Sequence, residues 1–474
     1  MGTRFDRQAA TSAARFSWFR RPVARARFIP TDAMRLLYNI LFSIGFLLSS
    51  PFYFLKMWRR GNWREGFSER FGRYGTRVKH AVTNRQVLWM HAVSVGEVNL
   101  CAQIIRALEP RAPNLKIAVT TTTSTGMGEL RKKLPASILK LYYPVDFRRS
   151  VSRALMILHP EAVVLVEAEI WPNFLWKLRD RRVPAFLVNA RLSERSYRGY
   201  RRFGYLFRPL FAQFKGVGAQ SESDRQRLIE LGCRPEAVQV IGSLKFDAAK
   251  LDDRRLLDVE ALLRQLGVPV GAPVLLGGST HAGEEAILTD LFQRLRARHR
   301  DLFLVLVPRH FERGKEVGRE LEARGIKFIY RREVTASTQL EPGAVQCLLV
   351  NTTGELKYFY EAATVVFVGK SLVGQGGQNP IEPGALGKAM VFGPHMQNFP
   401  GITENFVNQN GARQVGDAAG LERACDELLA SSELREELGR NAQRVVRENA
   451  GGIERTVNMI VAELAKEDTY VAPE

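Results

Sequence analysis

Short apolar runs alternate with amphipathic stretches along most of the chain after residue 85. Uninterrupted apolar runs of this length are typical of strands buried on both faces, and the stretches between them have helical periodicity. This order predicts parallel sheets covered by helices on both faces. The predicted strands are residues 88–92, 116–122, 139–144, 162–169, 184–190, 216–220, 272–279, 302–309, 347–353, 364–370 and 389–394.

The predicted strands form two groups, which indicate two doubly wound α/β domains. Residues 240–247 and a charged helix from Asp252 separate the groups. We therefore assign residues 61–250 to a first domain and residues 251–474, which end in a terminal helix, to a second. Ligands of such sheets bind beyond the carboxyl ends of the strands, so we expect the site in a cleft between the domains.

Residues 36–55 contain no charged side chain over the length that a helix needs to cross a bilayer. Asn39, Gly45, Pro51 and three serines dilute the segment. A basic, aromatic flank follows and favours an anionic cytoplasmic leaflet. We predict a membrane anchor over residues 34–60, which either spans the bilayer or lies at its interface, and a buried core helix is the alternative. The flank consists of Lys56, Trp58, Arg59, Arg60, Trp63 and Arg64.

The net charge of +20 indicates an anionic partner, which can be nucleic acid, an acidic membrane or a phosphorylated substrate. Residues 1–33 contribute +5 and residues 56–85 contribute +7, so more than half of the excess lies beside the anchor. Residues 1–33 are typical of a flexible basic arm, and Met34 is a candidate for the natural start. The dispersed cysteines and histidines favour neither a disulfide framework nor a metal site, and they fit a reducing cytosol.

Carboxylates stand at the ends of two predicted strands. Glu97 lies in HAVSVGEV (91–98), where it either caps a helix or acts as a general base that takes a proton from an attacking hydroxyl. Glu167 and Glu169 lie in VEAEIWPNF (166–174), and they share one face if the strand continues to Trp171. Carboxylates in an apolar run are costly to bury without partners, which makes these residues candidates for a site.

Arginines alternate with aromatic residues over 190–211. Such a stretch suits single-stranded nucleic acid, a surface that lies on anionic lipid, or a core helix whose arginines reach solvent. The anchor favours lipid over nucleic acid, and the core helix stays open.

Features that suit phosphate gather in the second half of the chain. In 277–285, Ser279 or Thr280 is placed to cap a helix whose free N–H groups could hold an anion. Pro308 and Arg309 end the next predicted strand, and residues 352–356 end the one after.

A glycine-rich loop follows in GQGGQNPIEPGALG (374–387). Asn379, Pro380 and Glu382 have the form of a capping box, and the glycines before them allow a ligand to approach the backbone. Neither Gly369-Lys370-Ser371 nor Gly387-Lys388 completes a P-loop, which disfavours an ATPase.

In this order, HAVSVGEV, VEAEIWPNF, NARLSERS, GSLKFD, GGSTHAGEE, VPRHFER and GGQNPIEPGALG resemble the 3-deoxy-D-manno-octulosonic acid (Kdo) transferases of lipopolysaccharide biosynthesis. The resemblance implies a GT-B fold of two Rossmann-like domains that face a cleft. It also implies CMP-Kdo as donor, a lipid A precursor as acceptor, an anionic inner membrane with the catalytic domains on its cytoplasmic side, and no metal or cofactor.

The resemblance also assigns roles by position. Glu97 matches the proton acceptor, and Glu167 and Lys245 match residues that stabilise the transition state. Three segments match the positions that hold CMP: Pro308, Arg309, Gly354, Glu355, Leu356, Asn379, Pro380, Ile381 and Glu382.

The chemistry of these side chains agrees with such roles. An attacking sugar hydroxyl must lose a proton to a base, and the phosphate of departing CMP can be stabilised by Arg309, Lys245 and helix N-termini. A single displacement inverts the anomeric centre. Two alternatives stay open: another membrane-associated GT-B glycosyltransferase that uses a UDP-sugar, and a basic nucleic-acid-binding protein. The second leaves residues 374–387 and the anchor unexplained, so we expect no nucleic-acid partner.

Overall fold

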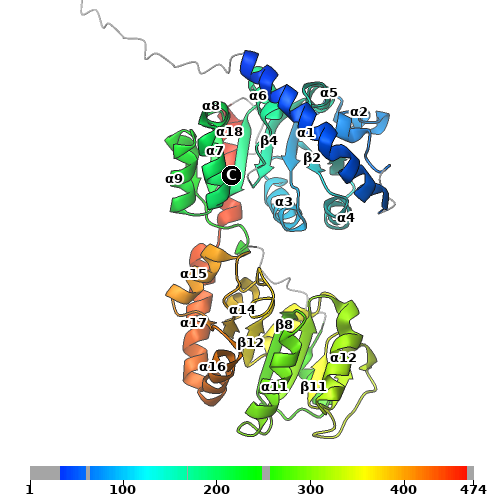
Figure 1. Cartoon of the computed structure of the whole chain (residues 1–474), viewed down its shortest axis with the longest axis vertical. Helices are drawn as coiled ribbons and strands as arrows, with labels where there is room; N and C mark the ends of the chain where they lie inside the picture. The colour runs from blue at the N-terminus through cyan, green and yellow to red at the C-terminus, as the bar shows by residue number, and fades with distance from the viewer. Residues whose placement is uncertain (1–31, 60–63, 168, 248–256, 467–474) are drawn as a thin grey trace, which may run out of the picture.

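The structure is a computed structural model, and it describes residues 32–59, 64–167, 169–247 and 257–466. These residues form two lobes, each built around one seven-stranded sheet (Figure 1). The strand orders are β3-β2-β1-β4-β5-β6-β7 and β10-β11-β9-β8-β12-β13-β14, and neighbouring strands run parallel. The predicted pair of doubly wound α/β domains is confirmed.

The strands of the first sheet are β1 Val87–His91, β2 Lys116–Thr121, β3 Leu139–Tyr142, β4 Pro160–Val166, β5 Ala185–Ala190, β6 Gly216–Ala219 and β7 Val238–Val240. Those of the second are β8 Val274–Thr280, β9 Phe303–Pro308, β10 Phe328–Tyr330, β11 Cys347–Leu349, β12 Val365–Val368, β13 Ala389–Phe392 and β14 Arg413–Gln414. Each predicted strand has its counterpart. The pattern does not reveal β7, β10 and β14, because these short strands are only partly buried or exposed, whereas β11 is equally short but fully buried.

The helices of the first lobe are α1 Asp32–Arg59, α2 Thr76–Val82, α3 Val95–Leu108, α4 Ser124–Lys133, α5 Arg148–Leu158, α6 Pro172–Asp180, α7 Glu194–Arg202, α8 Gly204–Phe211 and α9 Glu222–Glu230. The others are α10 Val259–Gln265, α11 Glu284–Arg296, α12 Gly314–Ala323, α13 Leu356–Ala362, α14 Ile381–Ala385, α15 Pro400–Asn408, α16 Ala418–Ala430, α17 Ser432–Asn449 and α18 Gly452–Lys466.

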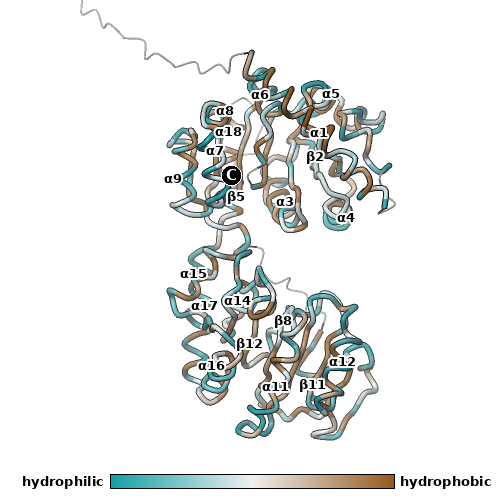
Figure 2. Tube along the Cα trace, viewed as in Figure 1, coloured by the Kyte–Doolittle hydropathy of each residue, from teal (hydrophilic) through white to brown (hydrophobic). Residues whose placement is uncertain are grey.

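Each sheet is apolar on both faces, as strands buried between two helical layers must be. In β1, Trp89 joins a core with α5, α6 and α8, whereas Leu88 and Met90 join the opposite core with α3, α4 and α18. The brown positions in Figure 2 follow the strands into the middle of both lobes and also run along α1.

The terminal helix differs from our assignment. It consists of two helices, of which α17 packs in the second lobe and α18 returns to the first, where Ile460 and Leu464 join the core beside α3 (Figure 1). Gly451 ends the first helix with a positive φ of 83°. The carboxylate of Asp247 accepts the backbone N–H groups of Gly451 and Ile453 at 2.6 and 2.8 Å. The chain therefore crosses between the lobes twice.

Helix α1 is, in the described part of the chain, the one helix long and apolar enough to cross a membrane. The predicted apolar N-terminal helix is thus confirmed, and the buried core helix is wrong because no residue of α1 is buried. Residues 1–31 of the basic arm that we predict lie outside the described residues, while Asp32 and Ala33 begin α1, and the start of the charged helix at Asp252 is likewise outside the described residues.

Replacing Asp247 tests how firmly α18 is held. Asp247→Ala leaves two backbone N–H groups at the start of α18 without their acceptor, which should lower the free energy of unfolding by about 2–3 kcal/mol. Urea denaturation measures this loss. Glu448→Ala, at an exposed position of α17, is the control and should stay within about 0.5 kcal/mol of the parent chain. An equally small effect of Asp247→Ala would contradict the assignment.

Candidate active site

The strand order creates a switch point in each sheet, at which the chain continues from two neighbouring strands toward opposite edges of the sheet. A crevice forms between the loops that leave these two strands. In the first sheet this point lies between β1 and β4, and in the second it lies between β8 and β12. Ligands of open parallel sheets bind at such switch points, beyond the carboxyl ends of the strands. Glu97 follows β1 and Glu167 follows β4, so both stand at the crevice of the first sheet.

Glu97 is built into the start of α3. Its Oε2 accepts the backbone N–H of Val93 at 2.8 Å, and its Oε1 accepts the Ser94 hydroxyl at 2.7 Å. Ser94 Oγ accepts the backbone N–H of Glu97 in return, which completes a capping box. The capping role is therefore confirmed. It fixes the carboxylate, which is only 8% exposed, at the edge of the crevice.

Glu167 takes a strained backbone conformation directly after β4, with a φ of 64°. Because β4 ends at Val166, the expectation that Glu167 and Glu169 share a strand face up to Trp171 is wrong. Burial, and then the charge of Glu97, raise the pKa of Glu167. The carboxylates of Glu97 and Glu167 therefore lie close enough to affect each other.

Lys245 joins this pair from the segment between the lobes. Burial lowers the pKa of its ammonium, while the negative charges of Glu167 and Glu97 act in the opposite sense. Its Nζ lies 3.5 Å from the carbonyl oxygen of Asn398 and 4.7 Å from the ring centre of Phe399, both in the second lobe. The structure thus brings Glu97, Glu167 and Lys245 together where the two lobes meet.

Sequence reasoning missed two residues of this cluster. Asn189 is fully buried with a φ of 54°, donates to Glu167 Oε1 at 3.3 Å and accepts the backbone N–H of Leu244 at 3.3 Å. The charge of Arg191 acts on the pKa values of both Glu167 and Lys245. The available signal was a single amide at the end of an otherwise apolar strand.

The loops of the second lobe hold the predicted donor segments at the carboxyl edge of its sheet. The backbone N–H of Arg309 donates to Thr280 O at 3.0 Å, which joins the ends of β8 and β9, and the Arg309 side chain is exposed. Glu355 accepts from Thr352 at 2.5 Å and pairs with Arg331 at 3.2 Å. Glu355 therefore holds its own loop in place.

The helix starts of the second lobe differ from the predicted caps. Helix α14 begins at Ile381, and Asn379 Oδ1 accepts the Ile381 N–H while its Nδ2 donates to Glu382. The reciprocal bond to Glu382 thus comes from the side chain of Asn379 and not from its backbone, so the predicted capping box is wrong in register. Burial raises the pKa of Glu382.

Ser279 and Thr280 do not cap a helix. Strand β8 runs on through Thr280, and α11 starts at Glu284 after Gly283, whose φ is 89°. The hydroxyl of Thr280 instead donates to Glu285 at 2.8 Å.

Glu284 organises the loops around the second crevice. It is fully buried, and its two oxygens accept the backbone N–H groups of four residues at 2.7–3.0 Å. One donor lies in the β8 loop and three lie in the β12 loop: His281, Lys370, Ser371 and Leu372. A single carboxylate therefore fixes the two loops that border the switch point.

The glycines of 374–387 serve the packing of the protein itself. Gly376 and Gly377 have φ values of 117° and 70°, and a Cβ on either would collide with Asn398 or Met396. The backbone of Gly376 exchanges hydrogen bonds with the segment that carries Gln397 and Asn398. Since Lys245 lies on the carbonyl of Asn398, the glycine loop supports the junction of the lobes.

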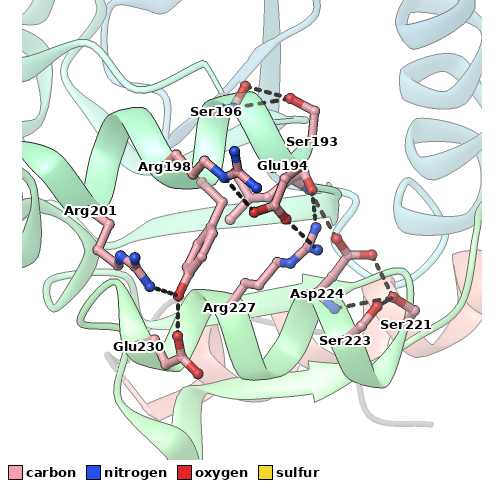
Figure 3. A network of polar contacts seen from close by, with 12 residues as sticks. Ser193, Glu194, Ser196, Arg198, Arg201, Ser221, Ser223, Asp224, Arg227 and Glu230 are labelled. Carbon is pink, nitrogen blue, oxygen red and sulfur yellow. Dashed lines mark hydrogen bonds and ion pairs between the residues drawn. The ribbon is translucent and has the colours of Figure 1, made fainter.

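The arginine and aromatic stretch over 190–211 is a core element in part, since its rings Phe203 and Tyr205 are exposed. Tyr197 and Phe211 are buried in the first lobe. Glu194 accepts hydrogen bonds from Arg198 and Arg227, each at 2.8 Å, and both contacts are drawn in Figure 3. The core-helix interpretation is therefore confirmed for these residues.

A family model described as 3-Deoxy-D-manno-octulosonic-acid transferase (kdotransferase) matches residues 65–248. A 3-deoxy-D-manno-octulosonic acid transferase of Haemophilus influenzae is 33% identical over 84% of this chain and 91% of its own. One of Bordetella pertussis is 33% identical over 87% of this chain and 96% of its own. The chain belongs to the 3-deoxy-D-manno-octulosonic acid transferase family. It is accordingly a glycosyltransferase.

The fold of this chain is also found in a solved structure of another glycosyltransferase. A glycosyltransferase from Rickettsia africae matches with a TM-score of 0.52 at 14% identity, over 81% of this chain and 100% of its own. At that identity the likeness concerns the fold, and it supports the GT-B arrangement of two Rossmann-like domains.

Replacing Glu284 tests its hold on the two loops. Glu284→Gln keeps the shape but turns an amide NH₂ toward two of the four backbone donors, so it should lower the free energy of unfolding by at least about 2 kcal/mol. Chemical denaturation measures the loss. The matched control is Glu312→Gln at an exposed position, for which we expect less than about 0.5 kcal/mol. Equal stability of the two variants would refute the role of Glu284.

Proposed function

We propose that this enzyme transfers Kdo from CMP-Kdo to a lipid A precursor at the cytoplasmic face of the inner membrane, with inversion at the anomeric carbon. Membership of the family supports the reaction. The observation that carries the mechanism is the cluster of Glu97, Glu167 and Lys245 at the first switch point, where the second lobe meets the first. On this proposal the first lobe binds the acceptor and the second lobe binds the donor.

Glu97 acts as the general base. The acceptor hydroxyl attacks the anomeric carbon of Kdo and passes its proton to the carboxylate, while the bond between that carbon and the phosphate oxygen of CMP breaks. Three donors from Val93 and Ser94 hold the carboxylate in one orientation. Catalysis by a base held in this way depends on positioning more than on high basicity.

Lys245 and Glu167 stabilise charge around the reacting carbon. Lys245 extends from the junction of the lobes, and its ammonium offsets the negative charge that develops on the departing phosphate. Glu167 is held by Asn189 at 3.3 Å and interacts with both Glu97 and Lys245. It keeps the ammonium oriented and favours positive charge at the anomeric centre.

The donor segments surround the second switch point. Arg309 presents an exposed guanidinium at the end of β9, suited to a phosphate. Glu382, whose pKa is raised by burial, is suited to hydrogen bonds with ribose hydroxyls. Pro308, Gly354 to Leu356 and Asn379 to Ile381 supply the loop backbone around them. No step requires a metal.

The alternatives are less well supported. A nucleic-acid-binding role depends on the rings of the stretch over 190–211, of which Tyr197 and Phe211 are buried in the core and Phe203 and Tyr205 are exposed. A UDP-sugar donor shares the same fold, so competition between CMP and UDP for the free enzyme distinguishes the two donors.

Glu97→Gln should abolish transfer and leave CMP binding unchanged. The single carbonyl oxygen of a glutamine can still accept both hydrogen bonds from Ser94, so the capping box of α3 is kept and only the bond from the Val93 N–H is lost, but a glutamine cannot take the proton. We expect kcat to fall by about 10²- to 10⁴-fold. Mass spectrometry of products from CMP-Kdo and a purified acceptor measures the rate. Glu109→Gln, exposed at the end of the same helix, is the control, and normal turnover of Glu97→Gln would exclude the proposed base.

Arg309→Met should weaken CMP binding by about ten- to a hundredfold, because it removes a charge-assisted hydrogen bond to phosphate. Calorimetric titration with CMP and with cytidine measures both affinities. Cytidine lacks the phosphate, so its affinity should not change. Arg319→Met, exposed on α12, serves as the control. An equal loss for CMP and cytidine would place Arg309 away from the phosphate.

A further inference from the structure

Helix α1 has a polar face that is docked on the first lobe. Arg35 forms a two-pronged ion pair with Asp180 at 3.1 Å, and the Tyr38 hydroxyl donates to Asp146 at 2.8 Å. Asn173 Nδ2 donates to the side chain of Asn39 at 2.9 Å. The Tyr38 ring also packs edge-on against Trp176 of α6, with centres 5.5 Å apart. The partners of Arg35, Tyr38 and Asn39 in α6 are thus Asp180, Trp176 and Asn173, so the first half of α1 runs antiparallel to α6.

Aromatic contacts continue the docked face. The ring of Phe42 lies edge-on to Trp171 and Phe147, with centres 6.5 and 5.3 Å away, and Phe46 contacts Phe147 at 4.9 Å. Polar and aromatic side chains thus fix one face of the helix from Arg35 to Phe46.

The opposite face of α1 is an exposed apolar stripe. Its side chains recur at helical spacing, and their exposed fractions range from 48% at Ile40 to 78% at Leu48. This arrangement is the reverse of a surface helix in a soluble protein, which turns its apolar side inward. The stripe consists of Leu36, Leu37, Ile40, Leu41, Ile44, Leu47 and Leu48.

The start of α1 and the chain shortly after the helix are attached to the same lobe. Arg35 is held by Asp180 at one end, and shortly after the other end Glu65 pairs with Arg131 at 2.8 Å. Residues 47–59, which follow the last docked ring, extend for only about 20 Å. A bilayer core is about 30 Å thick, so a helix held in this way cannot reach its far side.

Basic side chains gather beside the docked half of α1. Lys177 of α6 lies near three other cations, Arg148, Arg181 and Arg35, and its acidic neighbour among the interacting charges is Asp180. Arg148 and Arg181 are exposed. Lys56 and Arg59 add charge in the last turn. Cationic groups around an apolar stripe complement anionic lipid headgroups.

We propose that α1 lies flat on an anionic leaflet, with the apolar stripe in the boundary between headgroups and acyl chains and the polar face docked on α6. This rests on the proposal above that the enzyme works at a membrane. It excludes a helix that spans the bilayer.

The flat position of α1 brings the membrane next to the acceptor crevice. The Phe42 ring contacts Trp171, whose Nε1 donates to Glu169 at 2.8 Å. The charge of Glu97 acts on the pKa of Glu169, which burial raises. A lipid-borne acceptor in the leaflet therefore lies beside the loop that borders the crevice.

The depth of three labels in the full chain tests the orientation. Leu37→Cys, Leu41→Cys and Leu48→Cys are labelled separately with a fluorophore, since the four native cysteines are buried. Quenching by spin-labelled lipids in vesicles of phosphatidylcholine and phosphatidylglycerol should place all three at similar depths, about 5–10 Å below the headgroups. A steady change of depth toward the bilayer centre would overturn the proposal. Glu448→Cys, exposed on α17, is the control that lipid quenchers should not reach.

A second experiment follows the side on which the chain before α1 lies. Thr11→Cys and Glu448→Cys are treated separately with a membrane-impermeant maleimide in spheroplasts and in inverted inner-membrane vesicles. Both should be protected in spheroplasts and labelled in inverted vesicles. Labelling of Thr11→Cys from outside spheroplasts would show a spanning helix and overturn the proposal.

Binding to vesicles separates this inference from the proposed function. Sedimentation with vesicles that contain phosphatidylglycerol should be at least tenfold stronger than with pure phosphatidylcholine, because several basic side chains contribute. A chain that binds neither vesicle would overturn both the membrane role and the flat helix. A chain that binds but shows a depth gradient overturns the orientation alone, and transfer to a purified acceptor in detergent tests the reaction independently of both.

Discussion

Parallel pairing of the strands is the constraint on which the rest of the molecule depends. Because neighbouring strands run the same way in both sheets, their carboxyl ends share one edge, and the loops that carry chemistry emerge there. The reversal of strand order then selects one point on each edge. At those points stand Glu97 and Glu167 in one lobe and the loops held by Glu284 in the other.

Buried carboxylates fix these loops, and each bridges segments that are remote in sequence. Glu284 joins the loops after β8 and β12. Glu285 pairs with Arg313 at 2.7 Å, so it fixes the short helix after β9 against α11. Each such carboxylate is satisfied by several donors, as a charge removed from water requires. The rigidity of the site therefore comes from a few buried carboxylates, whose oxygens accept hydrogen bonds from protein groups in place of water. It does not come from the loop sequences themselves.

The apolar runs were sufficient to predict the main strands, the two domains and the location of the candidate site, since burial on both faces leaves a clear local pattern. The failures share a cause. Local spacing predicts helix caps at Ser279 or Thr280 and at Asn379. The side chains of Thr280 and Asn379 instead donate to Glu285 and Glu382, because the helices begin later than the spacing suggests. The return of α18 and the link from Asn189 to Leu244 depend on tertiary contacts, which no periodicity within one segment records.

The double crossing of the chain has a mechanical consequence. One crossing passes through Asp247 and the other through Gly451, and the carboxylate of Asp247 ties them to each other. Two connections that are tied together at one point restrict the relative movement of the lobes more than a single linker would, and that point would act as the pivot of any rotation. Lys245 lies two residues before Asp247, close to this point. A side chain near a pivot is displaced less by rotation than side chains farther away. The ammonium is thus held beside the one place that a rotation of the lobes would displace least.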